Sequence, residues 1–323
     1  MVCILLLFAA GWGCGGGDGD ECSGPGTGGQ PSDTVEVVPP PTDTTGVTPQ
    51  PGDTTGVEAP KDTCLLKVMT YNVRYDKGIF TTGTDSWRNI RKERTVRLLQ
   101  ERKPDVLGAQ EVLHNQLQDL TAVLTDYDYA GVGREDGETE GEYTPVFWLK
   151  ERFGLLEKGH FWYSETPDKP SKGWDAACER ICTWVKLKDK EHGKTFFVFN
   201  SHYDHEGVTA RKNSATLMME KINKIAGNYP VFCTGDFNAG SGDAAIQAIL
   251  RDGLLRDART KADKPLGCLN TYHGYEGKPG FSRIDFIFIT SNVRLFSYVT
   301  LDYKVDGYFP SDHFPVLIET EVL

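Results

Sequence analysis

Hydrophobic and polar positions alternate along most of the chain after Leu65, and at intervals the alternation gives way to helical spacing. Alternation predicts strands because successive side chains of a strand point to opposite faces, whereas apolar residues three or four apart predict helices. The predicted strands are residues 65–70, 105–109, 127–132, 145–150, 153–163, 180–188, 194–201, 230–234, 284–290, 292–302 and 314–320. The predicted helices are residues 87–102, 113–124, 207–226 and 243–251.

The helices interleave with the strands, but not in the strict alternation that a purely parallel sheet requires. Two mixed sheets packed face to face with helices outside account for this order. The composition does not change abruptly within residues 63–323, so we predict one α/β domain there.

The first residues have a different pattern. Residues 2–10 (VCILLLFAA) form an apolar run that is too short to span a bilayer. Small residues and Cys14 follow, in the order typical of a signal peptide, although a positively charged start is missing. The segment Gly11-Trp12-Gly13-Cys14 resembles a bacterial lipobox, with Gly11 and Trp12 as departures. We expect residues 1–14 to direct the protein out of the cytoplasm, lipid-anchored to a bacterial membrane at Cys14 or secreted.

Residues 15–62 are rich in Gly, Pro, Thr and Asp and almost lack aromatic residues. Such a composition buries too little apolar surface to offset the entropy of ordering, so we predict a disordered linker. No coiled-coil or repeat pattern indicates self-association of the following domain, which we expect to be a monomer.

The charge is unevenly distributed. The whole chain carries −11, but residues 1–62 contribute nine acidic side chains and one basic side chain, which leaves −3 for residues 63–323. The predicted domain is nearly neutral, so its overall charge does not indicate a nucleic-acid ligand. A local basic groove remains open as an alternative.

The eight cysteines do not have the spacing of a zinc site, and only Cys178 and Cys182 are close in sequence. An oxidising compartment would favour one or two disulfides, whose pairing the sequence leaves open.

Polar residues fall at the ends of predicted strands at six places, where α/β enzymes commonly carry their sites. The six motifs are Thr70-Tyr71-Asn72-Val73, Gln110-Glu111, Asn200-Ser201-His202-Tyr203-Asp204-His205, Thr234-Gly235-Asp236-Phe237-Asn238, Arg283-Ile284-Asp285-Phe286-Ile287 and Ser311-Asp312-His313. Taken singly they have structural explanations: Glu111 suits a helix N-terminus, and Asp236 suits a turn. Asp285 is harder to explain, because a lone carboxylate inside an apolar strand is costly without a partner.

Together and in this order, the six motifs resemble the endonuclease/exonuclease/phosphatase superfamily, which has the deoxyribonuclease-I-like fold. The resemblance covers residues 65–320 and implies a four-layer α/β sandwich with two mixed, mainly antiparallel sheets. Its histidine motif is closer to the secreted bacterial and deadenylase-like branches than to abasic-site repair enzymes.

The resemblance implies a divalent metal, most simply Mg²⁺ with Mn²⁺ as a substitute. Glu111 would be a direct ligand, oriented by Asn72, and Asp312 would contact the metal directly or through water. Carboxylates suit Mg²⁺, which requires only one or two of them from the protein. The metal would neutralise the phosphate and polarise it.

The resemblance also implies the catalytic residues. Asp236 would orient or deprotonate the attacking water, and Asn238 would position the water or the phosphate. Asp285 would pair with His313 and raise its pKa, and whether His313 acts as a base or as a phosphate ligand stays open. His202 would donate to a non-bridging oxygen of the phosphate.

Further candidates surround this set. Arg180 lies on the strand where related nucleases carry a phosphate-binding arginine, and its planar fork suits that task. Asp204 and His205 are candidates to support the site from behind it. Tyr143 and His273 are weaker candidates, as a phosphate contact and as a residue lining the site.

We therefore expect a metal-dependent hydrolase of a phosphodiester or phosphomonoester, with a nuclease-like activity favoured. Its substrate would be a nucleic acid, a nucleotide, a lipid headgroup or a sugar phosphate. The alternatives are a sphingomyelinase-like headgroup phosphodiesterase, a sugar- or inositol-phosphate phosphatase, and, from another class, a non-catalytic binding lipoprotein.

Overall fold

The computed structural model describes residues 64–78, 83–276, 282–302 and 304–323. The expected signal segment 1–14 and linker 15–62 lie outside the described residues. All described residues belong to one compact unit, Glu58–Leu323. Within the described ranges, no helix has the length and apolar composition that crossing a membrane requires.

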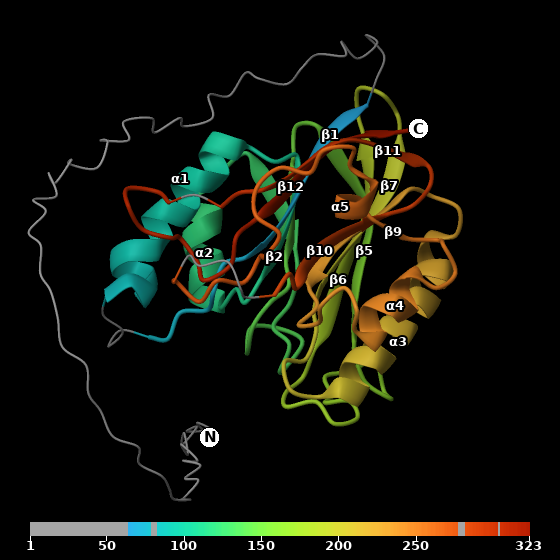
Figure 1. Cartoon of the computed structure of the whole chain (residues 1–323), viewed down its shortest axis with the longest axis horizontal. Helices are drawn as coiled ribbons and strands as arrows, with labels where there is room; N and C mark the ends of the chain where they lie inside the picture. Colours follow the sequence, from blue (N-terminus) through green and yellow to red (C-terminus); the bar gives the residue numbers. More distant parts are fainter. Residues whose placement is uncertain (1–63, 79–82, 277–281, 303) are drawn as a thin grey trace, which may run out of the picture. The chain divides into compact units, whose positions relative to one another are not determined.

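Two mixed sheets of six strands each form the centre of this unit (Figure 1). The first sheet has the order β11-β12-β1-β2-β4-β3 and the second the order β5-β6-β7-β8-β10-β9. One pair in each sheet is parallel, β1–β2 and β7–β8, and the other pairs are antiparallel. The strands are β1 (Leu65–Asn72), β2 (Val106–Gln110), β3 (Tyr127–Ala130), β4 (Val146–Leu149), β5 (Phe153–Trp162), β6 (Ile181–Asp189), β7 (Thr195–His202), β8 (Val231–Asp236), β9 (Arg256–Asp257), β10 (Asp285–Ile289), β11 (Val293–Thr300) and β12 (Val316–Val322).

Strand alternation divides the interior into separate cores. In β1, Val68 packs between the two sheets, whereas its neighbour Met69 packs on the outer face. In β7, Val198 and Phe199 divide in the same way between the inner core and the outer face of the second sheet. The helices that accompany the outer faces are α1 (Lys92–Arg102), α2 (His114–Val123), α3 (Val208–Ala226) and α4 (Ala244–Leu250). This arrangement confirms the expected four-layer α/β sandwich.

The predicted helix 87–102 is two elements. A π-helical turn, η2 (Trp87–Arg91), precedes α1 and follows a short 3₁₀ turn, η1 (Gly83–Asp85). The wider turn accompanies the buried side chain of Arg91, whose guanidinium donates to the carbonyl oxygens of Val73 and Arg74 at 2.7 and 2.8 Å. Arg91 thereby holds the segment that follows β1.

Besides η1, two elements were not predicted, β9 and the single helical turn α5 (Ala258–Lys261). Both are too short to show a periodic pattern, and the side chain of Asp257 caps α5 by accepting from the backbone N–H of Arg259. The five cysteines of the described residues, at positions 64, 178, 182, 233 and 268, are free thiols. The expected disulfides are therefore not formed among them.

A buried polar network joins the sheets below the ends of the parallel strands. The amide of Asn200 accepts from Gln110 Nε2 at 2.6 Å and from Thr234 Oγ1 at 3.0 Å. Gly108 makes this close approach feasible, because a Cβ there would lie 2.1 Å from Thr234 Oγ1 and 2.6 Å from Asn200 Oδ1. The network sets the distance between the two sheets where the candidate site begins.

Candidate active site

The carboxyl ends of the two parallel strand pairs meet across the sandwich. Asn72 ends β1, Glu111 follows β2, His202 ends β7 and Asp236 ends β8, and all four side chains are buried. Asn72 Nδ2 donates to Glu111 Oε1 and to Asp236 Oδ2, both at 2.9 Å, so one amide connects the two sheets. The amide oxygen of Asn72 accepts from the backbone N–H of Arg74 at 2.9 Å. In this arrangement Asn72 orients the two carboxylates and turns its own oxygen away from them.

Three site residues adopt the left-handed backbone conformation. Arg74 has φ +60°, Glu111 has φ +59° and Asn238 has φ +46°. Such conformations are uncommon outside glycine, and they concentrate where the surrounding structure holds a functional side chain in place. The backbone N–H of Asn238 donates to Asp236 Oδ1 at 2.9 Å, which helps to hold this conformation.

His313 and Asp285 form a buried pair. His313 Nδ1 donates to Asp285 Oδ2 at 2.9 Å, and His313 Nε2 lies 3.8 Å from Asp236 Oδ2. Burial lowers the pKa of His313, but the carboxylates of Asp285, Asp236 and Asp312 together outweigh it and raise the pKa to about 10. The imidazole is therefore protonated at neutral pH in this arrangement and points Nε2 at the cluster.

A second histidine faces the cluster from the other side. His202 Nε2 lies 3.7 Å from Asp236 Oδ2 and 3.1 Å from Asn238 Nδ2. Its Nδ1 lies 3.5 Å from Glu142 Oε2, and that carboxylate accepts from Arg134 at 2.7 Å. The carboxylate of Glu142 thus lies beside His202 without a hydrogen bond to its buried Nδ1, in contrast to the hydrogen-bonded pair of Asp285 and His313.

Glu142 and Arg134 were missed in the sequence. They lie on the loop between β3 and β4, among several acidic residues that carry no pattern. The one signal that the sequence offers for Glu142 is its position shortly before the strand that begins at Val146. Only the spatial arrangement shows that this position lies beside His202.

Arg74 was also missed, and it lies among the predicted metal ligands. Its guanidinium is 3.5 Å from Glu111 Oε2 and 3.4 Å from Asp312 Oδ2. The backbone N–H of Tyr75 donates to Glu111 Oε2 at 3.1 Å. Since Arg91 fixes the backbone of this segment, Arg91 also positions the contacts to Glu111.

The cluster holds more negative than positive charge. Four buried carboxylates meet there, and the facing cations are Arg74 and the protonated His313. The carboxylates are those of Glu111, Asp236, Asp285 and Asp312. Burial, reinforced by Asp285, raises the pKa of Asp236, and burial also raises the pKa of Asp312. Carboxyl groups pushed toward neutrality in this way fit a site that a cation completes.

The donor atoms have a suitable arrangement for such a cation. Side-chain atoms of Glu111, Asp236 and His313 lie within 4.8 Å of one another, and because His313 is protonated, the two carboxylates are the donors that a cation would use. Asp285 Oδ1 is buried and has no hydrogen-bond partner. The donors are mainly carboxylate oxygens, which favour a hard divalent cation.

Arg180, Asp204 and His205 form a group beside His202. Arg180 Nε donates to Asp204 Oδ2 at 3.2 Å, and Arg180 Nη2 lies 2.8 Å from His205 Nδ1. Arg180 Nη1 is buried without a partner, and the residue borders a small recess together with Glu142 and His202. Asp204 and His205 thus hold the guanidinium of Arg180 beside the cluster, while its Nη1 makes no hydrogen bond.

Tyr143 and His273 lie differently. The hydroxyl of Tyr143 donates to the Glu138 carbonyl oxygen at 2.9 Å and lies 3.0 Å from His114 Nδ1, so these contacts direct it away from the cluster. His273 is buried behind the cluster and stacks on Phe314 with 3.9 Å between ring centroids. Burial lowers the pKa of His273 to about 4, which keeps the ring neutral.

Comparison with known proteins agrees with this geometry. Residues 69–313 match the family described as endonuclease/exonuclease/phosphatase. The structure of the endonuclease/exonuclease/phosphatase from Bacteroides vulgatus is 40% identical, with a TM-score of 0.76, and the match covers 80% of this chain and 99% of that one. The mannosyl-6-phosphatase of Bacteroides thetaiotaomicron is 38% identical, with a TM-score of 0.74 and coverage of 79% and 99%.

A more distant relative is the 3'-5'-exoribonuclease subunit Ccr4 of the CCR4-Not complex from Emericella nidulans. It is 24% identical over 80% of this chain, which spans about half (52%) of the Ccr4 length. Family members are phosphoesterases and nucleases, and the acidic cluster described above occupies the positions where the six motifs meet. The chain therefore belongs to the endonuclease/exonuclease/phosphatase family and is a hydrolase of phosphate esters.

Proposed function

We propose that this protein is a divalent-metal-dependent phosphomonoesterase that removes the phosphate of a sugar phosphate. The observation that carries the proposal is the convergence of Glu111, Asp236 and His313 within 4.8 Å of one another, which brings a carboxylate for a cation, a carboxylate base and a protonated imidazole to one place. The sugar phosphate is supported by the match to a mannosyl-6-phosphatase over nearly the whole of that chain. A nearly neutral domain, at −3 over residues 63–323, also suits a small ester better than a polynucleotide.

In this proposal Glu111 and Asp312 would hold Mg²⁺, while Asn72 orients Glu111 and Arg74 orients Asp312. The bound cation supplies charge neutralisation at the phosphoryl oxygens. Asp236 accepts the proton of the attacking water, and its raised pKa makes it a stronger base than an ordinary aspartate.

The remaining side chains contact the phosphate. His313, held protonated by Asp285, donates from Nε2 to a phosphoryl oxygen. His202 and the uncommitted Nη1 of Arg180 approach from the other side of the cluster. Preorganised donors of this kind stabilise developing charge more effectively than water does, because they need no reorganisation during the reaction.

The test compares substrates with the full chain after removal of metal. We expect Mg²⁺ to restore phosphate release from mannose 6-phosphate and from 4-nitrophenyl phosphate, with slower turnover of bis(4-nitrophenyl) phosphate. The absence of metal-dependent turnover on all three esters would overturn the proposal.

A 3'-5'-exoribonuclease is the second candidate, favoured by the similarity to Ccr4 along 80% of this chain. This second candidate corresponds to the nuclease-like activity that the sequence analysis favoured. Mg²⁺-dependent shortening of a single-stranded oligoadenylate, without phosphate release from mannose 6-phosphate, would select it over the phosphatase.

We further propose that the enzyme acts outside the cytoplasm as a monomer on a lipid anchor. The basis is the apolar run at residues 2–10 followed by Cys14. Labelled palmitate should enter the full-length chain in a bacterial host and should not enter Cys14→Ala. Equal labelling of both would contradict the anchor.

A further inference from the structure

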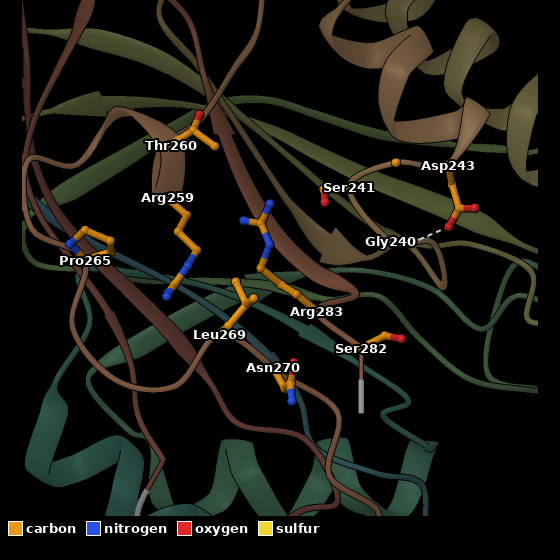
Figure 2. Close-up of a pocket in the computed structure, with 11 residues that line it drawn as sticks. Gly240, Ser241, Asp243, Arg259, Thr260, Pro265, Leu269, Asn270, Ser282 and Arg283 are labelled. Carbon is orange, nitrogen blue, oxygen red and sulfur yellow. Dashed lines mark hydrogen bonds between the residues drawn. The ribbon is translucent and has the colours of Figure 1, made fainter. Parts of the chain in front are cut away.

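A groove of about 630 Å³ lies beside Ser282 and Arg283, in the segment that leads into β10 (Figure 2). Its walls are the loop 240–243, Arg259 and Thr260 of α5, the residues Pro265, Leu269 and Asn270 of the following loop, and the pair Ser282–Arg283. We call it the α5 groove. Its volume is within the range of about 300–1,000 Å³ that small-molecule sites occupy.

The short strand β9 explains why the groove exists. β9 pairs with Phe288 and Ile289 at the far end of β10, whereas Asp285–Ile287 have no partner from β9. The chain instead turns into α5 and passes through the loop 265–270. The edge of the sheet nearest the cluster is therefore lined by loops and side chains.

The α5 groove adjoins the candidate active site through three connections. Gly240 lies two residues after Asn238, and Arg283 lies two residues before Asp285, so each pair of Cα atoms is at most about 7 Å apart. On the third side, the carbonyl oxygen of Thr271, next to Asn270, accepts from the backbone N–H of Phe314 at 2.7 Å. Phe314 directly follows His313.

The two arginines of the groove differ in their partners. Arg283 is buried and bidentate on Asp257, so its charge is compensated. Arg259 extends from α5 into the groove (Figure 2). Its guanidinium carbon lies over the ring of Tyr298, 5.3 Å from the centroid, and its Nη1 is buried without a hydrogen-bond partner. Among the described residues, no carboxylate forms an ion pair with Arg259.

The rest of the lining is mixed in polarity. Ser241, Asn270 and Ser282 offer hydroxyl and amide groups that both donate and accept, while Leu269 is 59% exposed and presents an apolar surface. Hydroxyl-rich donors and acceptors around an apolar patch match a sugar ring, which has hydroxyl groups at its rim and C–H groups on its faces. One uncompensated guanidinium is too little positive charge to follow a polynucleotide backbone.

We propose that the α5 groove binds the sugar part of the substrate while the phosphate lies in the acidic cluster. Arg259 donates to ring hydroxyl oxygens, and Leu269 packs on a C–H face of the ring. This inference rests on the proposed sugar phosphatase activity and adds to it the residues that select the leaving group.

Two readouts separate the groove from the catalytic activity. The first is the steady-state kinetics of the full chain with Mg²⁺ on mannose 6-phosphate and on 4-nitrophenyl phosphate, whose leaving group has no sugar hydroxyls. The second is saturation-transfer NMR with methyl mannoside, which carries no phosphate and needs no turnover.

For Arg259→Ala we expect KM for mannose 6-phosphate to rise at least about 10-fold, because one charged hydrogen bond to the sugar is lost. KM and kcat for 4-nitrophenyl phosphate should stay within 2-fold of the parent, and the NMR signal from methyl mannoside should disappear. Leu269→Ala should raise KM for mannose 6-phosphate by a smaller factor. It changes an exposed side chain, so folding is not at risk.

Matched controls are Arg294→Ala, an exposed arginine of β11, and Leu266→Ala, an exposed leucine outside the groove lining. Neither control should change either readout. Unchanged kinetics on both esters and an unchanged NMR signal in Arg259→Ala and Leu269→Ala would overturn the groove proposal and leave the phosphatase standing. The opposite outcome is a parent chain that hydrolyses neither ester but binds methyl mannoside, with the NMR signal lost in Arg259→Ala. This result would support the groove and overturn the proposed function.

Discussion

Asp236 and Asp285 face each other as direct partners in the antiparallel ladder between β8 and β10. Two buried carboxylates in this position repel each other unless cations approach, and His313 approaches both, at 3.8 and 2.9 Å. The ladder thus places the candidate base and the carboxylate that charges the histidine on adjacent strands. The chemistry proposed for the site depends on this pairing.

The pH dependence of the reaction should follow His313. Asp285, Asp236 and Asp312 together raise its folded-state pKa to about 10, so its stabilising charge is present below the unfolded value of about 6.5 and is lost as the pH rises toward 10. We expect Asp285→Asn to move the alkaline limb of the pH–rate profile to lower pH by at least about one unit. Asp302→Asn, at an exposed position, is the control. An alkaline limb that stays in place in Asp285→Asn would exclude the protonated His313 as the donor.

Metal binding should depend on Glu111. Glu111→Gln keeps the size of the side chain but removes the charge of the expected direct ligand, so Mg²⁺ binding measured by calorimetry should weaken at least about 10-fold and turnover should fall about 100-fold or more. Glu151→Gln, at an exposed turn, should bind the metal like the parent. Parent-like Mg²⁺ affinity in Glu111→Gln would remove Glu111 from the ligand set.

Glu142 should affect turnover through His202. Glu142→Gln leaves the side chain in place but removes the negative charge that lies 3.5 Å from His202 Nδ1, so we expect kcat to fall about 10-fold with KM changed less. The melting temperature should fall by only a few degrees. Glu140→Gln on the same loop, with an exposed side chain, is the matched variant and should keep the parent kcat. A kcat equal to the parent in Glu142→Gln would contradict this role.

Gly108 should be intolerant of a side chain. A Cβ there would overlap Thr234 Oγ1 and Asn200 Oδ1 in the network between the sheets, so Gly108→Ala should lower the free energy of unfolding by about 3 kcal/mol. Gly154→Ala in β5, where the nearest atom would be 3.9 Å away, should cost much less. Chemical denaturation of both variants is the measurement, and equal losses would show that the network is not the cause.

Asp204 should contribute to stability at neutral pH. Burial opposes its ionisation, but the backbone N–H of Gly207 and the guanidinium of Arg180 lower its pKa to about 2. A lowered folded-state pKa gives stability above the unfolded value of about 3.9, and that stability is lost as the pH falls toward 2. We expect Asp204→Asn to lose about 2 kcal/mol at pH 7 and to approach the parent near pH 2 in denaturant titrations. A difference that does not change with pH would contradict the electrostatic origin.

Much of the fold was predictable because its signals are local. The alternation in β1 and β7 assigns Val68 and Val198 to one face and their neighbours to the other, and the structure places them in separate cores. The prediction of helix 87–102 missed the π-helical turn, since the cause is a buried contact from Arg91 to carbonyl oxygens that precede it by 17 and 18 residues.

The sequence by itself determined the fold family and the strand-end motifs, because those polar residues lie at or near the ends of hydrophobic strands that predict their positions. Only the tertiary structure decided which further side chains complete the candidate active site. Glu142, Arg134 and Arg74 lie in segments without periodicity, and their contacts to His202 and Asp312 join positions that are 60 and 238 residues apart. Charges that act across such separations leave no local pattern, since packing of the two sheets alone brings them within reach.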